Sequence, residues 1–210
     1  MLEINYDIKT ALPEDRAMDF ANMWKAVGGD DNLIFENVKL MEYLGDGGFF
    51  TAPASTKYHG AYSGGLYDHS RTVAARLIWL TKQLDLKWQR KESPFIIGMF
   101  HDLCKCDQYL KVPDEKTVTV DQWGKPLEEL VTSWKYEYNT NTLLKGHGSK
   151  SVMILSQFIN LTEEEMLCIR YHMGAYEKEE WTEFDAAIRK YETVLWTHQA
   201  DMLASKVDDI

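Results

Sequence analysis

Cysteine and long apolar runs are both scarce in this sequence of 210 residues. Its three cysteines include no second pair that would complete a zinc site, and a sparse, odd count is typical of a reducing compartment. No apolar run approaches the roughly 20 residues that a membrane span requires. The polar N-terminus also lacks the apolar core of a signal peptide. We therefore expect a cytoplasmic protein without membrane contact.

The sequence also has fewer basic residues than acidic residues. The chain has 23 Lys and Arg against 33 Asp and Glu, which gives a formal net charge of −10. A surface of this sign does not attract the phosphates of duplex nucleic acid, so we expect no long duplex as a partner. A bound cation can still attract a phosphate locally. The net charge therefore does not exclude a small phosphorylated substrate.

Apolar periodicity indicates a mostly helical fold. Helices are expected over about 14–27, within 33–44, and over 66–85, 93–105, 147–159, 162–171 and 183–206, with a glycine-rich loop over 45–65. Between residues 107 and 145 two β-branched and aromatic stretches alternate around a break at 124–126, which predicts a small hairpin. The expected class is an all-α helical bundle with a small inserted β-hairpin. We expect residues 1–50 to form a helical extension packed on a core of residues 51–210.

The aromatic residues of the expected hairpin allow two interpretations. Tyr109, Trp123, Trp134, Tyr136 and Tyr138 follow a candidate site directly in sequence, so they could wall a pocket and stack on a base. Alternatively, they pack the hairpin onto the bundle.

The pair His101-Asp102 is the strongest local signal for chemistry. It lies in PFIIGMFHDLCK, an almost wholly apolar stretch that must be buried. A charged aspartate is costly to bury unless it is paired or bound to a metal. Lys105 follows three residues later and could supply a positive charge. The sequence therefore predicts a buried ionic or metal site here.

Four further residues could complete a metal site: His69, His147, His172 and Asp201. Each lies on an expected helix or at its end, and such positions can converge in the core of a bundle. Taken singly, each of the six histidines is more readily structural, so the prediction depends on the set. Four imidazoles and two carboxylates can hold two divalent ions, whether Fe, Mn, Co, Zn or Mg.

The order of these residues resembles the signature of the HD superfamily of metal phosphohydrolases. His69, His101-Asp102 and Asp201 match its His…His-Asp…Asp order, and His147 and His172 match the extra histidines of its binuclear members. KYHGAYSGGLYDHS is similar to a segment of the HD domain in a bacterial 3′→5′ exoribonuclease. HDLCK, GHGSKSV, LTEEEMLCIRYHMG and HQAD resemble small bacterial and phage HD hydrolases. The resemblance covers about 55–206.

This resemblance implies a set of roles. His69, His101, Asp102 and Asp201 would hold one metal, and Asp102 would bridge to a second held by His147 and His172. Asp102 and Lys105 would be catalytic. Lys105, His147, Ser149, Lys150 and His198 would bind the substrate. His59 matches a histidine of the exoribonuclease segment, and we expect it to pack its loop, with substrate contact as the alternative.

The implied activity is hydrolysis of a phosphoester or phosphoanhydride bond, in a nucleotide or short oligonucleotide, by a metal-activated hydroxide. The start of the expected helix at 147 would suit an anion, because free N–H groups and the helix dipole favour one. Simple helix capping by Gly146 and Gly148 is the plainer interpretation. Three other classes remain: an HD-fold di-iron oxygenase, a non-catalytic nucleotide-binding module, and a structural protein with incidental histidines.

Overall fold

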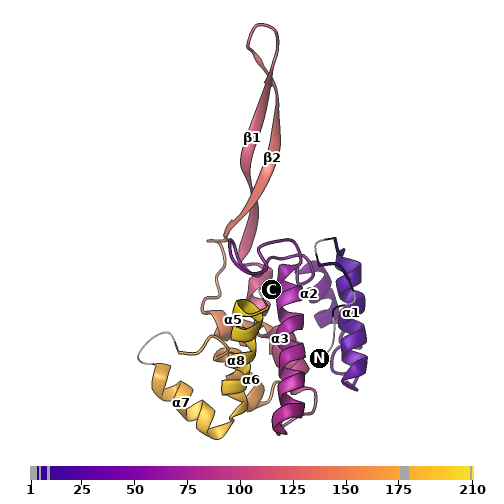
Figure 1. The fold of residues 1–210 in the computed structure, drawn as a ribbon, viewed down its shortest axis with the longest axis vertical. Coiled ribbons are helices and arrows are strands. Elements are labelled where there is room, and N and C mark those ends of the chain that lie inside the picture. Colours follow the sequence, from indigo (N-terminus) through magenta and orange to yellow (C-terminus); the bar gives the residue numbers. More distant parts are fainter. Residues whose placement is uncertain (1–3, 5, 9, 176–179, 209) are drawn as a thin grey trace.

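The computed structural model describes residues 4, 6–8, 10–175, 180–208 and 210. Their elements, in order, are α1 (Pro13–Ala26), α2 (Val38–Asp46), α3 (Gly65–Leu84), α4 (Ser93–Phe100), the 3₁₀ helix η1 (Leu103–Cys106), β1 (Tyr109–Val120), β2 (Pro126–Tyr138), α5 (His147–Leu155), α6 (Glu163–Arg170), α7 (Glu180–Lys190) and α8 (Thr193–Lys206). The helices form one body, and the hairpin projects from it (Figure 1). The expected all-α class is therefore right only in part, because the chain is mostly helical but carries an extended hairpin.

Helix α3 lies at the centre of the body and packs against α4 and α8. Every residue of α4 is buried, as its uniformly apolar sequence predicts. Phe20 and Trp24 of α1 belong to the same core, and the ring of Trp24 lies 5.0 Å from that of Phe95 in α4. Arg16 of α1 also forms a buried ion pair with Asp68 of α3 at 2.8 Å. Residues before position 50 are thus tied to both central helices.

Four expected helices differ from those observed. The helix expected over 93–105 ends as α4 at Phe100 and is followed by η1, and the helix expected over 147–159 ends as α5 at Leu155. The segment 183–206 is two helices, because α7 ends at Lys190 and α8 begins at Thr193. The buried hydroxyl of Thr193 donates a hydrogen bond to Glu164 of α6 at 2.6 Å, which ties the start of α8 to the body. Helix α2 begins only at Val38, because the side chain of Asn37 caps it by accepting a hydrogen bond from the Leu40 N–H.

The glycine pair at the start of α3 allows a close approach of the preceding loop. A Cβ on Gly65 would lie 2.0 Å from the carbonyl oxygen of Gly60, so no larger residue fits there. Gly64 has a φ of 85°, a conformation that favours glycine. These contacts hold the loop of residues 51–64 against the first turn of α3, next to His69.

The hairpin is longer than expected. Its strands have 12 and 13 residues and pair antiparallel from Tyr109↔Tyr138 to Val120↔Pro126. Most of it stands away from the helices (Figure 1), with Trp123 81% exposed and Trp134 53% exposed. For Trp123 and Trp134, the interpretation that these residues pack the hairpin onto the bundle is therefore wrong. Among the described residues, no helix is both long and apolar enough to cross a membrane.

Shortening the hairpin should leave the helical body intact. A variant in which a two-residue Asn-Gly turn replaces residues 112–135 would join Lys111 to its ladder partner Tyr136. We expect the free energy of unfolding to change by no more than about 1 kcal/mol, since the removed side chains are mostly exposed. Chemical denaturation followed by helical circular dichroism measures this. Loss of cooperative unfolding would contradict it.

Candidate metal centre

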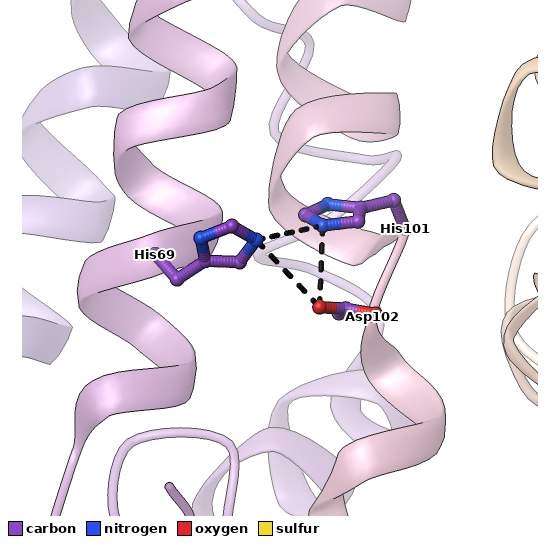
Figure 2. A group of neighbouring side chains, drawn as sticks. All are labelled: His69, His101 and Asp102. Carbon is purple, nitrogen blue, oxygen red and sulfur yellow. Dashed lines mark hydrogen bonds and ion pairs between the residues drawn. The ribbon is translucent and has the colours of Figure 1, made fainter. Parts of the chain in front are cut away.

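Six side chains converge where α3, α4, α5, α6 and α8 meet. They are His69 in α3, His101 and Asp102 just after α4, His147 at the start of α5, His172 just after α6, and Asp201 in α8. All are buried except His147, which is partly exposed. Figure 2 shows the rings of His69 and His101 pointing toward Asp102 from neighbouring helices. The structure thus brings together all six residues that the sequence suggests as metal ligands.

The carboxylate of Asp102 has imidazole nitrogens near both of its oxygens. Its Oδ2 lies 3.4 Å from Nε2 of His101 and 3.7 Å from Nε2 of His69. Its Oδ1 lies 2.7 Å from Nε2 of His147 and 3.4 Å from Nε2 of His172. The two oxygens therefore face two separate pairs of histidines.

Asp201 belongs to the first of these groups. Its Oδ1 lies 3.0 Å from Nε2 of His69 and 3.9 Å from Nε2 of His101. The two imidazole nitrogens are themselves 3.3 Å apart. Ligand atoms held about 2.0–2.2 Å from one ion lie roughly 3–3.5 Å from one another. His69, His101 and Asp102 have spacings close to those of ligands around one ion, and Asp201 lies at such a distance from His69.

Three buried polar atoms in the second group have no hydrogen-bond partner within the described part of the chain: Asp102 Oδ1, His147 Nε2 and His172 Nε2. The first two lie 2.7 Å apart but do not form a hydrogen bond. An unsatisfied buried polar atom costs about 1–3 kcal/mol, and native proteins retain few. One cation between the three atoms would satisfy all of them. These residues therefore fit a metal ion.

Backbone carbonyls fix the orientation of two of the rings. Nδ1 of His101 lies 2.8 Å from the carbonyl oxygen of Gly98, and Nδ1 of His172 lies 2.7 Å from that of Ile169. A carbonyl oxygen can only accept, so Nδ1 carries the hydrogen in each ring. Nε2 is then left with its lone pair directed into the cluster, as in histidines that bind metals.

Lys105 and two histidines together keep Asp102 charged. Its Nζ lies 2.7 Å from Asp102 Oδ2, and both side chains are almost fully buried. Burial acts to raise the pKa of Asp102, but the charges of Lys105, His101 and His147 outweigh it and hold that pKa well below its usual range. Burial likewise acts to lower the pKa of Lys105, and Asp102 raises it above its usual value. The aspartate is therefore ionised at neutral pH, as a metal ligand must be.

Cys104 lies beside the second group, although the spacing of the three cysteines predicts no zinc site. Its Sγ is 3.6 Å from Nδ1 of His147, and Asp102, Cys104 and His147 form one of the groups that could hold a metal. Burial raises the pKa of the Cys104 thiol to about 12. The only sequence signal for it is its position two residues after Asp102.

A cavity of about 720 Å³ opens beside the cluster. Asp102, Lys105, His147 and Asp201 line it, together with Ser149 and His198. Nδ1 of His198 donates to the carbonyl oxygen of His172 at 2.8 Å, which leaves its Nε2 free for a ligand. The volume falls within the range of about 300–1,000 Å³ that is typical of small-molecule sites.

Two expectations about the start of α5 receive plainer explanations. Lys150 lies outside the cavity, because its buried amino group forms a short ion pair with Asp107. The structure therefore brings Ser149, but not Lys150, to the site. A Cβ on Gly148 would lie 2.3 Å from the carbonyl oxygen of Arg170, so this glycine is required for the close packing of α5 on α6.

The loop of residues 51–64 supplies further cavity residues, of which sequence reasoning names only His59. Ala54, Ser55, Tyr58 and His59 line the cavity, and the ring of His59 lies 5.0 Å from that of His69. Burial, with help from His69 and Lys105, lowers the pKa of His59 to about 4, so this ring is neutral at pH 7. The sequence feature that identifies His59 is its place in KYHGAY. At the base of the hairpin, Tyr109 and Tyr138 also reach the cavity.

Comparisons with protein-family models, curated proteins and solved structures find no match to this chain. Two groups of side chains that could hold a metal occur among the described residues, namely His69 with His101 and Asp102, and Asp102 with Cys104 and His147. Asp102 is common to both. The case for a function therefore depends on the geometry around this one carboxylate.

Proposed function

We propose that this chain is a metal-dependent phosphohydrolase of the HD superfamily. It hydrolyses a phosphoester or phosphoanhydride bond in a small phosphorylated substrate, with a nucleotide as the working choice. One observation carries the proposal: Asp102 directs one oxygen toward His69 and His101 and the other toward His147 and His172. A carboxylate placed between two sets of ligands suits a hydrolytic site with two metals.

The proposal assigns each ligand to one of two positions. His69, His101, Asp102 and Asp201 would hold the first ion, and Asp102, His147 and His172 the second. Two divalent ions bound here would supply an activated water near neutral pH and neutralise charge on a phosphoryl group. Imidazole and carboxylate ligands suit Fe, Mn, Co or Zn, and carboxylates also suit Mg.

Protein side chains around the cavity would bind and orient the substrate. Lys105 is charged and lines the cavity, so its ammonium can donate a hydrogen bond to a phosphoryl oxygen as negative charge develops there. Ser149 and His198 can donate or accept hydrogen bonds from other sides of the cavity. The neutral ring of His59 can do the same from the loop of residues 51–64.

Replacing Lys105 with glutamine should lower kcat by about 10²–10³-fold and leave both metals bound. Lys105 is not a metal ligand in this account, but its charge faces the reacting group. Metal content and kcat measured on the same preparation separate the two effects. A matched control is Lys190→Gln, which removes an exposed lysine paired with Glu163 on the surface. Loss of metal together with activity would contradict the role given to Lys105.

The proposed activity is tested by elemental analysis and a phosphate-release screen. Purified protein is analysed for metals and then assayed over nucleotides and simple phosphoesters with Mn, Fe, Co, Mg or Zn, and a parallel aerobic assay records oxygen consumption. About two metals per chain, with release of phosphate or nucleotide, would support the proposal. Two irons, oxygen consumption and no hydrolysis would favour the di-iron oxygenase instead. Ligand binding without turnover under any condition would favour the binding module.

A further inference from the structure

His69 is held by a part of the chain far from it in sequence. Its Nδ1 lies 2.8 Å from the backbone carbonyl oxygen of Ile210. That oxygen can only accept, so Nδ1 carries the hydrogen and Nε2 is free to face Asp102 and Asp201. Unlike His101 and His172, whose rings contact carbonyls of their own helical turns, His69 therefore depends on a contact that bridges 141 residues.

An ion pair anchors the segment that carries this carbonyl. Arg76 forms two contacts with Asp208, one of them 2.8 Å from Nε to Oδ2. Both side chains are about four-fifths buried, with exposures of 18% and 20%. Arg76 follows His69 by two helical turns, so the two lie on one face of α3. The amide of Ile210 also donates to the carbonyl oxygen of Ala204 in α8 at 3.2 Å.

We infer that the C-terminal segment, meaning Val207, Asp208 and Ile210 among the described residues, is a positioning element for His69. The segment continues from α8, which carries Asp201, and returns to α3, which carries His69. It thus links two ligands of the first metal position. The Arg76–Asp208 pair holds Ile210 where its carbonyl fixes the imidazole ring. Metal affinity at this position depends on that pair, and this part of the inference rests on the proposed function.

Groups that support a ligating histidine have a measurable effect. Their loss typically lowers metal affinity about 10- to 100-fold, because the ring is no longer fixed in one tautomer and orientation. Asp208 and Arg76 pair with each other and belong neither to the six candidate ligands nor to the residues that line the cavity. Substituting them therefore weakens the contact that orients His69 and leaves all six candidate ligands in place.

Two variants test the inference, each with two measurements. Asp208→Asn removes the charge of the anchor, and a variant ending at Val207 removes the accepting carbonyl. Mn²⁺ titration followed by electron paramagnetic resonance should show one of two equivalents weakened about 10- to 100-fold. Nitrogen-15 NMR of histidine-labelled, metal-free protein should show Nδ1 of His69 protonated in the wild type and mixed tautomers in the variants. Asp185→Asn, which removes an exposed partner of Arg189, is the control.

The outcomes separate this inference from the proposed function. If the wild type binds two Mn²⁺ and Asp208→Asn binds both equally well with an unchanged His69 tautomer, the positioning role is wrong and the metal site stands. If the wild type binds none of Mn, Fe, Co, Zn and Mg, the proposed function fails, and the tautomer alone decides whether the segment positions His69. If the shortened variant does not fold, Asp208→Asn decides the matter by itself.

Discussion

Replacing Asp102 with asparagine is expected to leave both metal positions empty and to reduce turnover to the background of the assay. Asparagine is uncharged and has one oxygen in place of two. It therefore cannot bridge an ion held by His69 and His101 to another held by His147 and His172. The loss of affinity should exceed the roughly 10- to 100-fold effect of removing a group that only supports a ligand. Elemental analysis and phosphate release measure both quantities.

A folding control is needed for this variant, because Asp102→Asn leaves Lys105 buried without its counter-charge. Breaking a buried ion pair on one side costs about 3–5 kcal/mol. The double variant Asp102→Asn with Lys105→Met removes both charges and should recover much of that stability without recovering the metals. If Asp102→Asn kept two metals and full turnover, the assignment of the site would be wrong.

Replacing His147 with alanine should remove one metal and keep the other. Of the two Asp102 oxygens, Nε2 of His147 approaches Oδ1, whereas His69 and His101 approach Oδ2 and Asp201 lies beside His69. We expect metal content to fall from about two per chain to about one. Turnover should fall at least about 10²-fold, since charge stabilisation from one side of the phosphoryl group is lost. The partial exposure of His147 makes this substitution mild for folding.

Two further variants test whether the loss expected in His147→Ala belongs to the second metal position alone. His172→Gln changes the other histidine on the same side and should give the same content of one metal. His198→Ala should retain both metals and raise KM, because His198 lines the cavity but faces neither oxygen of Asp102. Loss of both metals in His147→Ala would mean that the two positions are not separable.

The helical part of the fold could be predicted because its signals are local. The capping box of α6 is present: the Glu165 N–H donates to the Thr162 hydroxyl at 3.2 Å, and the Thr162 N–H donates to Glu165 at 2.9 Å. The apolar run of α4 is also confirmed by its complete burial. By contrast, no glycine or proline marks the break between α7 and α8. It coincides with a long-range hydrogen bond from Thr193 to Glu164, which no window of sequence reveals.

The hairpin shows another limit of local signals. Alternation in the sequence identifies its two strands, because side chains of a strand point to opposite faces in turn. It does not distinguish a hairpin that covers the helices from one that projects away from them. That outcome depends on contacts between distant residues, and Trp123 and Leu127 make few of them, with exposures of 81% and 68%.

The candidate site also has a part that the sequence predicts and a part that it does not. Its six candidate ligands could be proposed because a His-Asp pair stands out in an apolar stretch and because the order of all six resembles the HD signature. The groups that orient and surround them could not. Ile210 contacts His69, and Asp107 pairs with Lys150. His59 lines the cavity because its loop packs closely on the glycines at the start of α3. Each of these contacts depends on the tertiary fold.

The most direct test of the central claim is anomalous diffraction from a crystal of this protein grown with Mn²⁺. The account predicts two peaks, one on each side of the Asp102 carboxylate, with His69, His101 and Asp201 around one and His147 and His172 around the other. A single peak would demote His147 and His172 from ligands to substrate contacts. No peak at Asp102, in crystals where Mn²⁺ binds elsewhere, would contradict the account.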